Sequence, residues 1–227
     1  MEAMTTMTNP ERAYIPAAGH DLFLPLYDLV TKLMGMDAAR NALLAPAEFA
    51  PGQRLLDIGC GTGSFVTQLK RQHPNIEVVG LDPDPKALAR ARRKAQAAGL
   101  SIEFDEGFSY ALGYPSASFD RVLSTFMFHH LQPGEREQTL REINRVLKPG
   151  GRFLLLDFEV RESGGHHALS TIFHKHATLA ENSESRILAL LAGAGFANAK
   201  KFRERRALLG LAHTGYYEAS VPNSGRS

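Results

Sequence analysis

The chain has 227 residues, 44% apolar and 22% charged, so it holds enough apolar side chains for a core and is not disordered as a whole. Its single cysteine excludes an intramolecular disulfide and an all-cysteine metal site, and fits a reducing, cytoplasmic compartment. The net charge of +2 predicts no nucleic-acid partner, and no apolar run reaches the roughly 18 residues that span a bilayer.

In chain order, two helical candidates come first, at residues 21–35 and 37–49. Short apolar runs then alternate with segments of helical periodicity. The runs predict strands at residues 54–58, 76–81, 101–104, 119–124 and 152–158. The periodic segments predict helices at residues 65–71, 84–98 and 135–147, the last ended by Pro149-Gly150-Gly151. This alternation with short connections predicts an α/β fold with a parallel sheet covered by helices on both faces.

The end of the chain breaks this alternation. Residues 184–194 favour a helix, and residues 196–204 and 210–218 favour strands separated by only about five residues. Such a connection is too short for a crossover helix, so the last two strands are expected to form an antiparallel hairpin. We therefore expect seven strands, mostly parallel, with an antiparallel last strand. Without a repeat or linker we expect one domain, its core at residues 51–220, with residues 1–50 adding a tail and helices.

A glycine loop joins the first predicted strand to the first predicted helix. Gly59, Gly61 and Gly63 alternate there with other residues, and Asp82 ends the second predicted strand. Glycines let a ligand approach the backbone, and a carboxylate on the next strand end suits the two hydroxyls of a ribose. The spacing departs from the G-x-G-x-x-G of dinucleotide sites because Ser64 stands at the last glycine position. A nucleoside site is predicted, with a nicotinamide-dependent oxidoreductase as one alternative.

Five motifs in order carry a specific resemblance. Residues 55–65 resemble motif I of the class I S-adenosylmethionine-dependent methyltransferases, and Asp82 resembles their ribose-binding acid. Residues 118–122, 128–131 and 145–151 (SFDRV, FHHL and RVLKPGG) are similar to the ubiquinone/menaquinone biosynthesis branch of that family. The resemblance runs from about residue 55 to residue 158, and it implies a Rossmann-like fold with an N-terminal helical cap.

The resemblance implies S-adenosylmethionine as the cofactor and assigns residues to it. Its methionine half would lie over the glycine loop, with Asp57 beneath, its ribose on Asp82 and its adenine against Pro83. The full implied set is Asp57, Gly59, Cys60, Gly61, Gly63, Asp82, Pro83, Gly107, Phe108, Ser109 and Ser124. The family commonly has Gly-Asp-Ala after its third strand, where this chain has Gly107-Phe108-Ser109, so the adenine-binding acid is missing. Phe108 would stack on adenine, or Asp105 or Glu106 would replace the acid.

Transfer of a methyl group from a sulfonium is an in-line displacement, so the protein mainly aligns the reactants and excludes water. A base is needed only when the nucleophile arrives protonated. His129 and His130, which follow the fourth predicted strand, are the candidate bases, because imidazole titrates near neutral pH. The alternative is that they only pack or cap. Cys60 is interpreted as a packing residue rather than a nucleophile.

The acceptor pocket is expected among aromatic residues and histidines near these elements. Its candidates are Tyr14, His20, Tyr27, Phe126, His166 and His167. Two further histidines, His174 and His176, lie in the same long connection as the last two candidates. No metal site is predicted there, since the connection has no cysteine and few acids. The basic runs at residues 86–94 and 200–206 are interpreted as a solvated helix face and a protected edge strand.

The sequence thus predicts methyl transfer from S-adenosylmethionine to a small-molecule acceptor, aromatic or partly apolar, at an O, N, C or S atom. Three alternatives stay open: a nicotinamide-dependent oxidoreductase, a non-catalytic S-adenosylmethionine-binding protein, and a nucleic-acid methyltransferase. The sequence does not indicate the oligomeric state.

Overall fold

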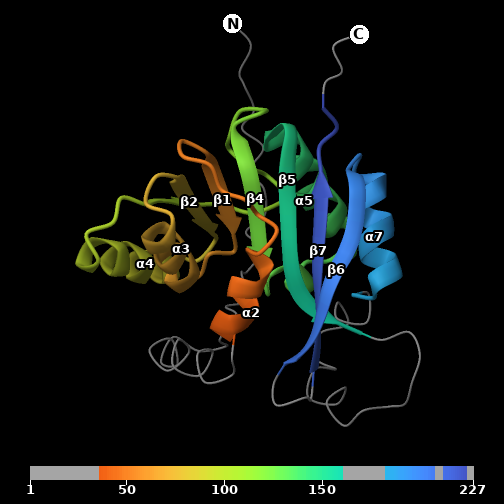
Figure 1. Cartoon of the computed structure of the whole chain (residues 1–227), viewed down its shortest axis with the longest axis horizontal. Helices are drawn as coiled ribbons and strands as arrows, with labels where there is room; N and C mark the ends of the chain where they lie inside the picture. Colours follow the sequence, from red (N-terminus) through yellow and green to blue (C-terminus); the bar gives the residue numbers. More distant parts are fainter. Residues whose placement is uncertain (1–35, 161–181, 208–211, 224–227) are drawn as a thin grey trace, which may run out of the picture.

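The computed structural model describes residues 36–160, 182–207 and 212–223. Its centre is a sheet of seven strands in the order β3-β2-β1-β4-β5-β7-β6 (Figure 1). The strands are β1 (Arg54–Ile58), β2 (Glu77–Asp82), β3 (Glu103–Glu106), β4 (Phe119–Thr125), β5 (Leu147–Glu159), β6 (Ala197–Ala207) and β7 (Ala212–Ser220). The first five are parallel, and β7 is antiparallel to both β5 and β6. The seven-stranded sheet and its antiparallel final hairpin are therefore confirmed.

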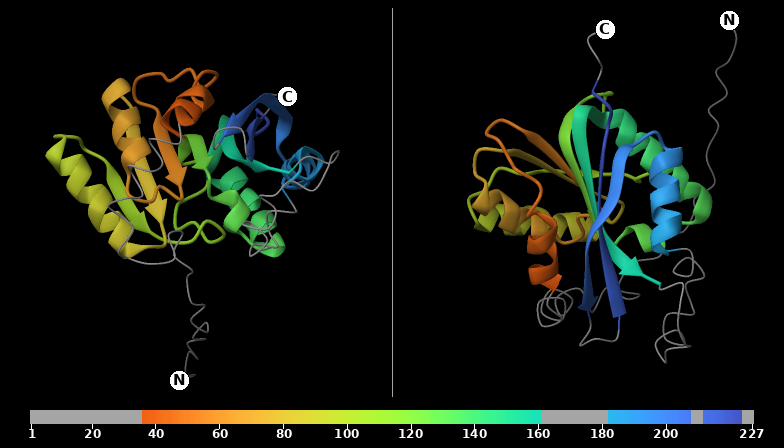
Figure 2. Two further views of the ribbon diagram at one scale, coloured as in Figure 1. Left: turned by 90° about the horizontal axis from the view of Figure 1, so that it is seen from below. Right: turned by 45° about the vertical axis from the view of Figure 1, so that its right-hand side comes forward.

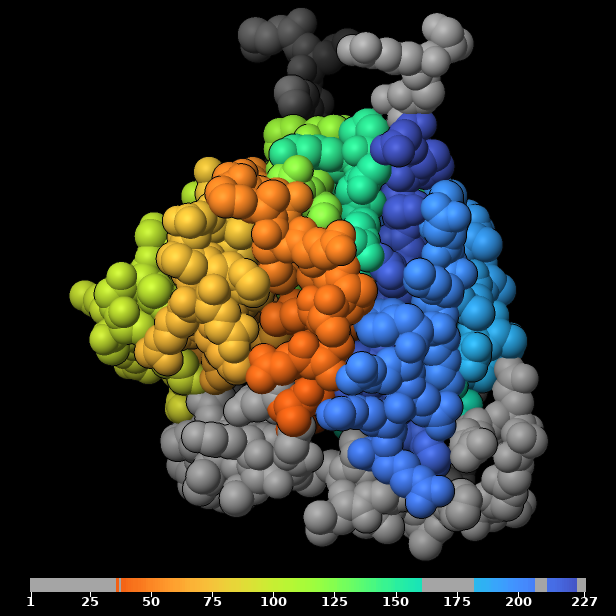
Figure 3. Space-filling model, viewed as in Figure 1, coloured from red at the N-terminus to blue at the C-terminus, as the bar shows by residue number. Residues whose placement is uncertain are grey.

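Helices cover both faces of this sheet. They are α2 (Met36–Leu43), α3 (Ser64–Gln72), α4 (Pro85–Ala97), α5 (Pro133–Val146) and α7 (Glu184–Gly193). The apolar side chains of α2, α3 and α4 share one core cluster, and those of α5 and α7 share another on the opposite face (Figure 2). In the space-filling view, α2 and the segment after it fill the space between α3 and β6 (Figure 3). The result is a three-layer α/β/α arrangement.

The central strands read as continuous apolar runs because both of their faces are covered. Successive side chains of a strand point to opposite faces, so Leu55 joins the cluster under α3 while Leu56 joins the cluster under α5. Leu123 and Val122 of β4 divide in the same way. This alternation also decides which polar residues at the strand ends share a face.

Local signals explain where the helices begin. Asp84 precedes α4 and accepts a hydrogen bond from the Lys86 N–H at 2.8 Å, and Pro85 occupies the first helical position. At the start of α5, the Glu135 carboxylate accepts from the Gln132 N–H at 3.0 Å. These caps bind main-chain N–H groups at the helix starts, so α4 begins at Pro85 and α5 begins at Pro133.

Some boundaries differ from those predicted. Helix α5 ends at Val146, and residues 149–151 lie within β5, where the Gly150 N–H donates to the Val221 carbonyl at 3.1 Å. Proline has no N–H and disfavours helix in the residue before it, which stops the helix while the chain is still able to pair as a strand. The predicted helix at residues 37–49 ends at Leu43, and β3 lies two residues later than expected.

Two further predictions fall on residues that the structure does not describe: the helix at residues 21–35 and the long connection at residues 161–182, of which only Asn182 is described. Within the described part of the chain, no helix has the length and apolar character needed to cross a membrane.

Candidate functional site

The carboxyl ends of β1, β2, β4 and β5 meet along one edge of the sheet, where ligands of open α/β folds bind. The glycine loop after β1 is held to the end of β2 by main-chain hydrogen bonds. The N–H groups of Gly59 and Cys60 donate to the Leu81 carbonyl at 2.8 and 3.0 Å. The loop then turns into α3, and this places it directly over the strand ends.

Asp82 binds this loop as well as its own strand end. Its Oδ2 accepts from the Gly61 N–H at 2.8 Å, and its Oδ1 accepts from the Asp84 N–H at 3.0 Å. Burial raises the pKa of the Asp82 carboxyl, and both main-chain hydrogen bonds lower it. A Cβ added at Gly61 would meet open space within 4 Å. The residue that Asp82 binds therefore borders a space that no described residue fills.

Asp57 lies on the same face of the sheet as Asp82, because its register partner in β2 is Gly80, two residues earlier. Its side chain is buried, and Oδ1 has no hydrogen-bond partner within the described part of the chain. Burial raises the pKa of the Asp57 carboxyl from 3.8 to about 7, the Arg40 guanidinium lowers it, and the Asp82 carboxylate raises it. A buried carboxyl with an unsatisfied oxygen is a ready partner for a cationic or hydrogen-bonding ligand group.

Arg40, which sequence reasoning did not single out, comes from α2. Its guanidinium carbon lies 5.8 Å from the centroid of the Phe65 ring and 5.9 Å from that of Phe126. It thus places a positive charge between the glycine-loop helix and the end of β4, close enough to act on Asp57. The periodicity of such a short helix does not indicate that its arginine reaches this edge.

Cys60 is buried in the loop, and a Cβ added at Gly80 would lie 2.9 Å from its Sγ. Burial, with the charges of Asp57 and Asp82, raises the pKa of the Cys60 thiol well above its usual range. A thiol that stays protonated is a poor nucleophile, which supports a packing role. On the other side of the loop, Lys94 of α4 donates to Thr62 Oγ1 at 2.9 Å and to Ser64 Oγ at 2.7 Å.

The segment after β3 presents an exposed aromatic ring at the same edge. Phe108 is 41% exposed and stacks on Tyr110 with ring centroids 5.2 Å apart. The Ser109 hydroxyl is bonded to Thr139 Oγ1 of α5 at 2.8 Å, so the polar groups it leaves for a ligand are those of the main chain. Asp105, one candidate replacement for the missing acid, accepts a hydrogen bond from the Tyr114 hydroxyl at 2.8 Å. Its neighbour Glu106 is exposed.

The end of β4 contacts the glycine loop. Phe126 has a φ of 56°, a left-handed conformation that is uncommon for a bulky residue and is held by a bond from its N–H to the Leu156 carbonyl at 2.8 Å. The next residue, Met127, lies against Gly59, where an added Cβ would come 2.6 Å from Met127 Cγ. The two loops are thus close neighbours. Ser124, also predicted to bind the cofactor, is fully buried, and no described residue binds its Oγ.

His129 and His130 lie in the short helix η2 (Phe128–His130) that follows. Asp157, near the end of β5, binds His129 through both of its carboxylate oxygens. Its Oδ1 lies 2.5 Å from Nδ1, and its Oδ2 accepts from the His129 N–H at 2.8 Å. Asp157 is fully buried and His129 is buried, whereas His130 is exposed with its ring centroid 4.0 Å from that of His129. Sequence reasoning missed Asp157, although a lone carboxylate in an apolar strand near the binding edge was a usable signal.

Phe126 is the one acceptor-pocket candidate that the structure describes. It lies beside Phe158 with ring centroids 5.0 Å apart. The other candidates, Tyr14, His20, Tyr27, His166 and His167, lie outside the described residues. Across residues 36–160, 182–207 and 212–223, no group of three or more His, Cys, Asp or Glu side chains is arranged to hold a metal ion.

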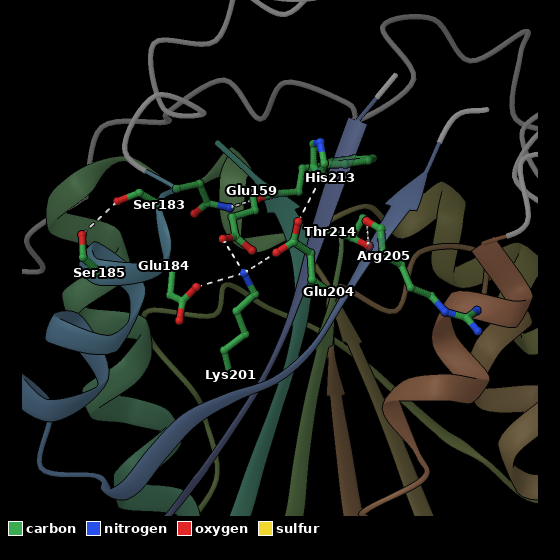
Figure 4. A network of polar contacts seen from close by, with 11 residues as sticks. Glu159, Ser183, Glu184, Ser185, Lys201, Glu204, Arg205, His213 and Thr214 are labelled. Atoms are coloured by element: carbon green, nitrogen blue, oxygen red, sulfur yellow. Dashed lines mark hydrogen bonds and ion pairs between the residues drawn. The ribbon is translucent and has the colours of Figure 1, made fainter. Parts of the chain in front are cut away.

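A second polar cluster lies at the same edge, beyond β5. Lys201 of β6 reaches three carboxylates, those of Glu159, Glu184 and Glu204, at 2.8, 3.0 and 3.0 Å (Figure 4). Although burial opposes it, hydrogen bonding to these carboxylates raises the pKa of Lys201 above its ordinary value. His213 of β7 joins through Glu204 at 3.0 Å. This Lys201 cluster ties together the end of β5, the start of α7 and the final hairpin.

Comparisons with known proteins agree with this geometry. A family model described as "Methyltransferase domain" matches residues 55–151. A demethylmenaquinone methyltransferase of Deinococcus radiodurans is 41% identical over 155 residues, which are 67% of this chain and 64% of that protein. One of the same name from Thermus thermophilus is 42% identical over 59% of this chain and 61% of its own length. The matches thus span less than two thirds of these relatives.

A solved structure shows the same fold. A phosphoethanolamine N-methyltransferase of Haemonchus contortus, in complex with phosphomonomethylethanolamine and S-adenosylhomocysteine, superposes with a TM-score of 0.75 at 19% identity. The match covers 91% of this chain and 58% of that one.

Proposed function

We infer that this chain is a class I S-adenosylmethionine-dependent methyltransferase that transfers the methyl group of S-adenosylmethionine to a small-molecule acceptor, an inference that the methyltransferase family model and the relatives above support. The observation that carries this function is the pair of buried carboxyls at the edge of β1 and β2. Asp82 is bonded to Gly61, and Asp57 has an oxygen that no described residue binds. Two acids beside a glycine loop suit a ligand that carries a ribose and a positive charge.

The residues present fit this donor. Asp82 would accept from the ribose hydroxyls, and Asp57 would face the ammonium group of the methionine half. The exposed ring of Phe108 and the main chain of Phe108 and Ser109 would receive the adenine. Bound S-adenosylmethionine would supply an activated methyl group on a sulfonium. The chain then has to align an acceptor with that methyl group and exclude water.

Arg40 completes the donor site in this proposal by binding the carboxylate of the methionine half. Its guanidinium lies between Phe65 and Phe126 and acts electrostatically on Asp57, so it can face the end of the donor that carries both charges. Arg40→Met should weaken binding of S-adenosylhomocysteine at least tenfold. Binding of 5′-methylthioadenosine, which lacks the amino-acid part, should change less than twofold. An equal loss for both ligands would contradict this role.

The acceptor is proposed to be an aromatic ring that bears a hydroxyl group. The two relatives above are named demethylmenaquinone methyltransferases, which points to a quinol-type ring. The rings of Phe126 and Phe158 form an apolar wall beside His129, with the Phe158 centroid 5.4 Å from that of the imidazole. In this proposal His129 takes the hydroxyl proton and His130 contacts the acceptor.

Thermal denaturation with two ligands tests the donor. S-adenosylhomocysteine at a hundred times its Kd should raise the free energy of unfolding by about 2.7 kcal/mol, while NADH should leave it unchanged. Stabilisation by NADH alone would instead favour the nicotinamide-dependent oxidoreductase. Transfer of labelled methyl from S-adenosylmethionine to a demethylmenaquinol analogue tests the reaction. Tight donor binding without transfer to any hydroxylated aromatic ring would favour a non-catalytic donor-binding protein.

The cytoplasmic location, the single domain with its cap at residues 1–50 and the absence of a nucleic-acid partner stay predictions. The single, buried thiol supports the cytoplasmic location. The even charge balance supports the absence of a nucleic-acid partner. Filter binding of an RNA duplex at low and high salt is a direct check on nucleic acid, because phosphate contacts make binding strongly salt-dependent.

A further inference from the structure

We propose that Asp157 is a positioning residue that fixes the tautomer of His129, so that Nε2 accepts the proton of a hydroxyl-bearing acceptor. The inference rests on the proposed methyl transfer and deepens it. It assigns a role to a residue that sequence reasoning missed, and it restricts the acceptor to substrates that must lose a proton before they react.

The hydrogen bonds around Asp157 determine which ring nitrogen carries the hydrogen. Its Oδ1 accepts from the Phe158 N–H at 2.7 Å and lies 2.5 Å from His129 Nδ1, and its Oδ2 accepts from the His129 N–H at 2.8 Å. A carboxylate already accepting from two main-chain N–H groups is set as an acceptor, so Nδ1 must be the donor. Nε2 is then the basic nitrogen, and it has no partner among the described residues.

Burial makes this pairing matter for proton transfer. Asp157 is fully buried and the side chain of His129 is 9% exposed, so the pair interacts in a medium of low dielectric constant. When Nε2 takes a proton, the ring becomes cationic while Nδ1 still faces the carboxylate. The buried charge of Asp157 therefore stabilises the product of proton transfer, in addition to orienting the ring.

A cap for η2 is the plainer explanation for the Asp157 carboxylate, but it accounts for only part of the geometry. Capping requires only the bond to the main-chain N–H group of His129, since the Phe158 N–H belongs to β5. It does not require the bond to the imidazole. That bond also holds the ring edge-on to Phe158, at 72° between the ring planes, on the loop whose Met127 contacts Gly59. The imidazole is therefore held two residues beyond Met127, the residue that contacts the donor loop.

Other titratable groups face this pair from three elements. His130 lies against the imidazole from η2 itself, Glu159 follows two residues later in β5, and Tyr217 approaches Asp157 from β7. Burial and the Glu159 carboxylate raise the pKa of the Tyr217 phenol, so this group is neutral near pH 7. The phenol therefore adds no charge beside the pair.

The chemistry balances with one proton moved. The acceptor O–H gives its proton to His129 Nε2, and the electron pair left behind forms the new bond to the methyl carbon from oxygen or from a conjugated ring carbon. The methyl–sulfur bond breaks, and its electrons leave sulfur as a neutral thioether. The imidazolium then releases its proton to water. If carbon is methylated, the ring hydrogen is lost afterwards as the ring regains aromaticity.

The test uses Asp157→Asn and a series of hydroxylated aromatic acceptors that differ in hydroxyl pKa, assayed at one pH. An asparagine presents an amide N–H where Asp157 has an acceptor, so it disfavours the tautomer with basic Nε2. The kcat should fall at least tenfold for acceptors that are protonated in solution. It should approach the wild-type value for acceptors that are already ionised, and the KM for S-adenosylmethionine should change less than twofold.

Asp120→Asn is the matched control. Asp120 also accepts from a main-chain N–H, that of Arg54 at 2.8 Å, but it lies at the opposite end of β4. Its variant should show no dependence of the rate on acceptor pKa beyond that of the wild type. A loss of equal size for ionised and protonated acceptors of Asp157→Asn would overturn the inference, as would an unchanged kcat.

Two further measurements keep the inference testable if Asp157→Asn folds poorly. His129→Gln should show the same dependence on acceptor pKa, because it removes the base itself. In the wild-type protein, a low-field proton resonance should report the Nδ1–H to Asp157 bond, and its absence would overturn the assignment. Calorimetric binding of S-adenosylhomocysteine to these variants separates the two proposals, since intact binding leaves the proposed donor in place when the inference fails.

Discussion

The Gly61 N–H donates a hydrogen bond of 2.8 Å to Oδ2 of Asp82, which joins the loop after β1 to the end of β2. The same carboxylate accepts from the Asp84 N–H at the start of α4. The acid proposed to receive the ribose thus also holds the shape of the loop under the methionine half. Donor affinity and loop order are therefore coupled through one side chain.

Asp82→Ala should consequently weaken S-adenosylhomocysteine binding at least tenfold, because charge-assisted hydrogen bonds of roughly 1.5–3 kcal/mol each are lost. It should also lower the stability of the donor-free protein by about 1–2 kcal/mol, since the N–H groups of Gly61 and Asp84 lose their acceptor. Calorimetry and denaturant unfolding measure the two effects. Asp105→Ala is the comparison. An equal loss of affinity in that variant would indicate that Asp105 replaces the missing adenine-binding acid.

The ionisation of Asp57 predicts a pH dependence near neutrality. Burial raises the pKa of this carboxyl from 3.8 to about 7, opposed by Arg40 and assisted by Asp82. A raised carboxyl pKa means that its contribution to stability is fully present below pH 3.8 and is lost as the pH rises through about 7. The donor-free protein should therefore become less stable from about pH 4 to about pH 7, and Asp57→Asn should flatten that part of the profile.

Donor binding should change in the opposite direction. A cationic methionine half favours the ionised carboxylate, so affinity should increase as the pH rises from 6 to 8, by at most about tenfold per pH unit. Titration calorimetry at pH 6.5 in two buffers of different ionisation enthalpy should detect proton release on binding. Identical heats in both buffers, or a pH-independent Kd, would exclude Asp57 as the group that titrates.

The sequence predicts well those features that depend on local periodicity. The buried strands appear as apolar runs because helices cover both faces of the sheet, and the five-residue gap before β7 leaves only a hairpin. The glycine loop and Asp82 could be placed for the same reason, since each follows a strand end. Residues 149–151 were misplaced because strand pairing with Val221, far along the chain, continues β5 through the glycines.

Pairings across the sheet could not be predicted in this way. Asp157 meets His129 because the register of β5 on β4 brings the end of one strand beside the helix that follows the other. Arg40 reaches the site only because α2 folds back over the sheet, and Asp105 is bonded to Tyr114 by the path of a loop. Each contact depends on two segments whose relative position no single motif contains.

A comparison of Gly59 with Gly52 distinguishes the cost of backbone strain from the cost of steric contact. Its φ is 76°, and an added Cβ would lie 2.6 Å from Met127 Cγ, whereas Gly52 has a φ of 80° with open space within 4 Å of such an atom. Gly52→Ala should therefore lower stability by only the roughly 1–2 kcal/mol of left-handed strain. Gly59→Ala should lower it further and weaken S-adenosylhomocysteine binding at least tenfold, because Met127 must move. Equal effects of the two variants on unfolding would contradict the contact.

Substitution of Lys201 tests whether the Lys201 cluster, which lies beyond β5, contributes to the stability of the fold. The side chains of Lys201 and Glu159 are 12% and 6% exposed, so Lys201→Met leaves a buried carboxylate without its cation. Breaking such a buried pair costs about 3–5 kcal/mol, a drop that urea unfolding at pH 7 would measure. Lys200→Met on the same strand removes a lysine that is 63% exposed and 3.6 Å from Glu218, and should change stability by less than about 0.5 kcal/mol.

The pKa of Lys201 and a second substitution together identify the cause of that loss. The raised pKa of Lys201 means that its stabilisation is complete below the ordinary lysine value of 10.5 and is lost as the pH rises through the higher folded value. In Lys201→Met, the remaining cost is the buried Glu159 carboxylate, which has lost its cation. Glu159→Gln added to Lys201→Met should therefore recover most of the lost stability at pH 7. A loss that persists in the double variant would mean that lost packing of the lysine stem, rather than an unpaired carboxylate, destabilises the variant.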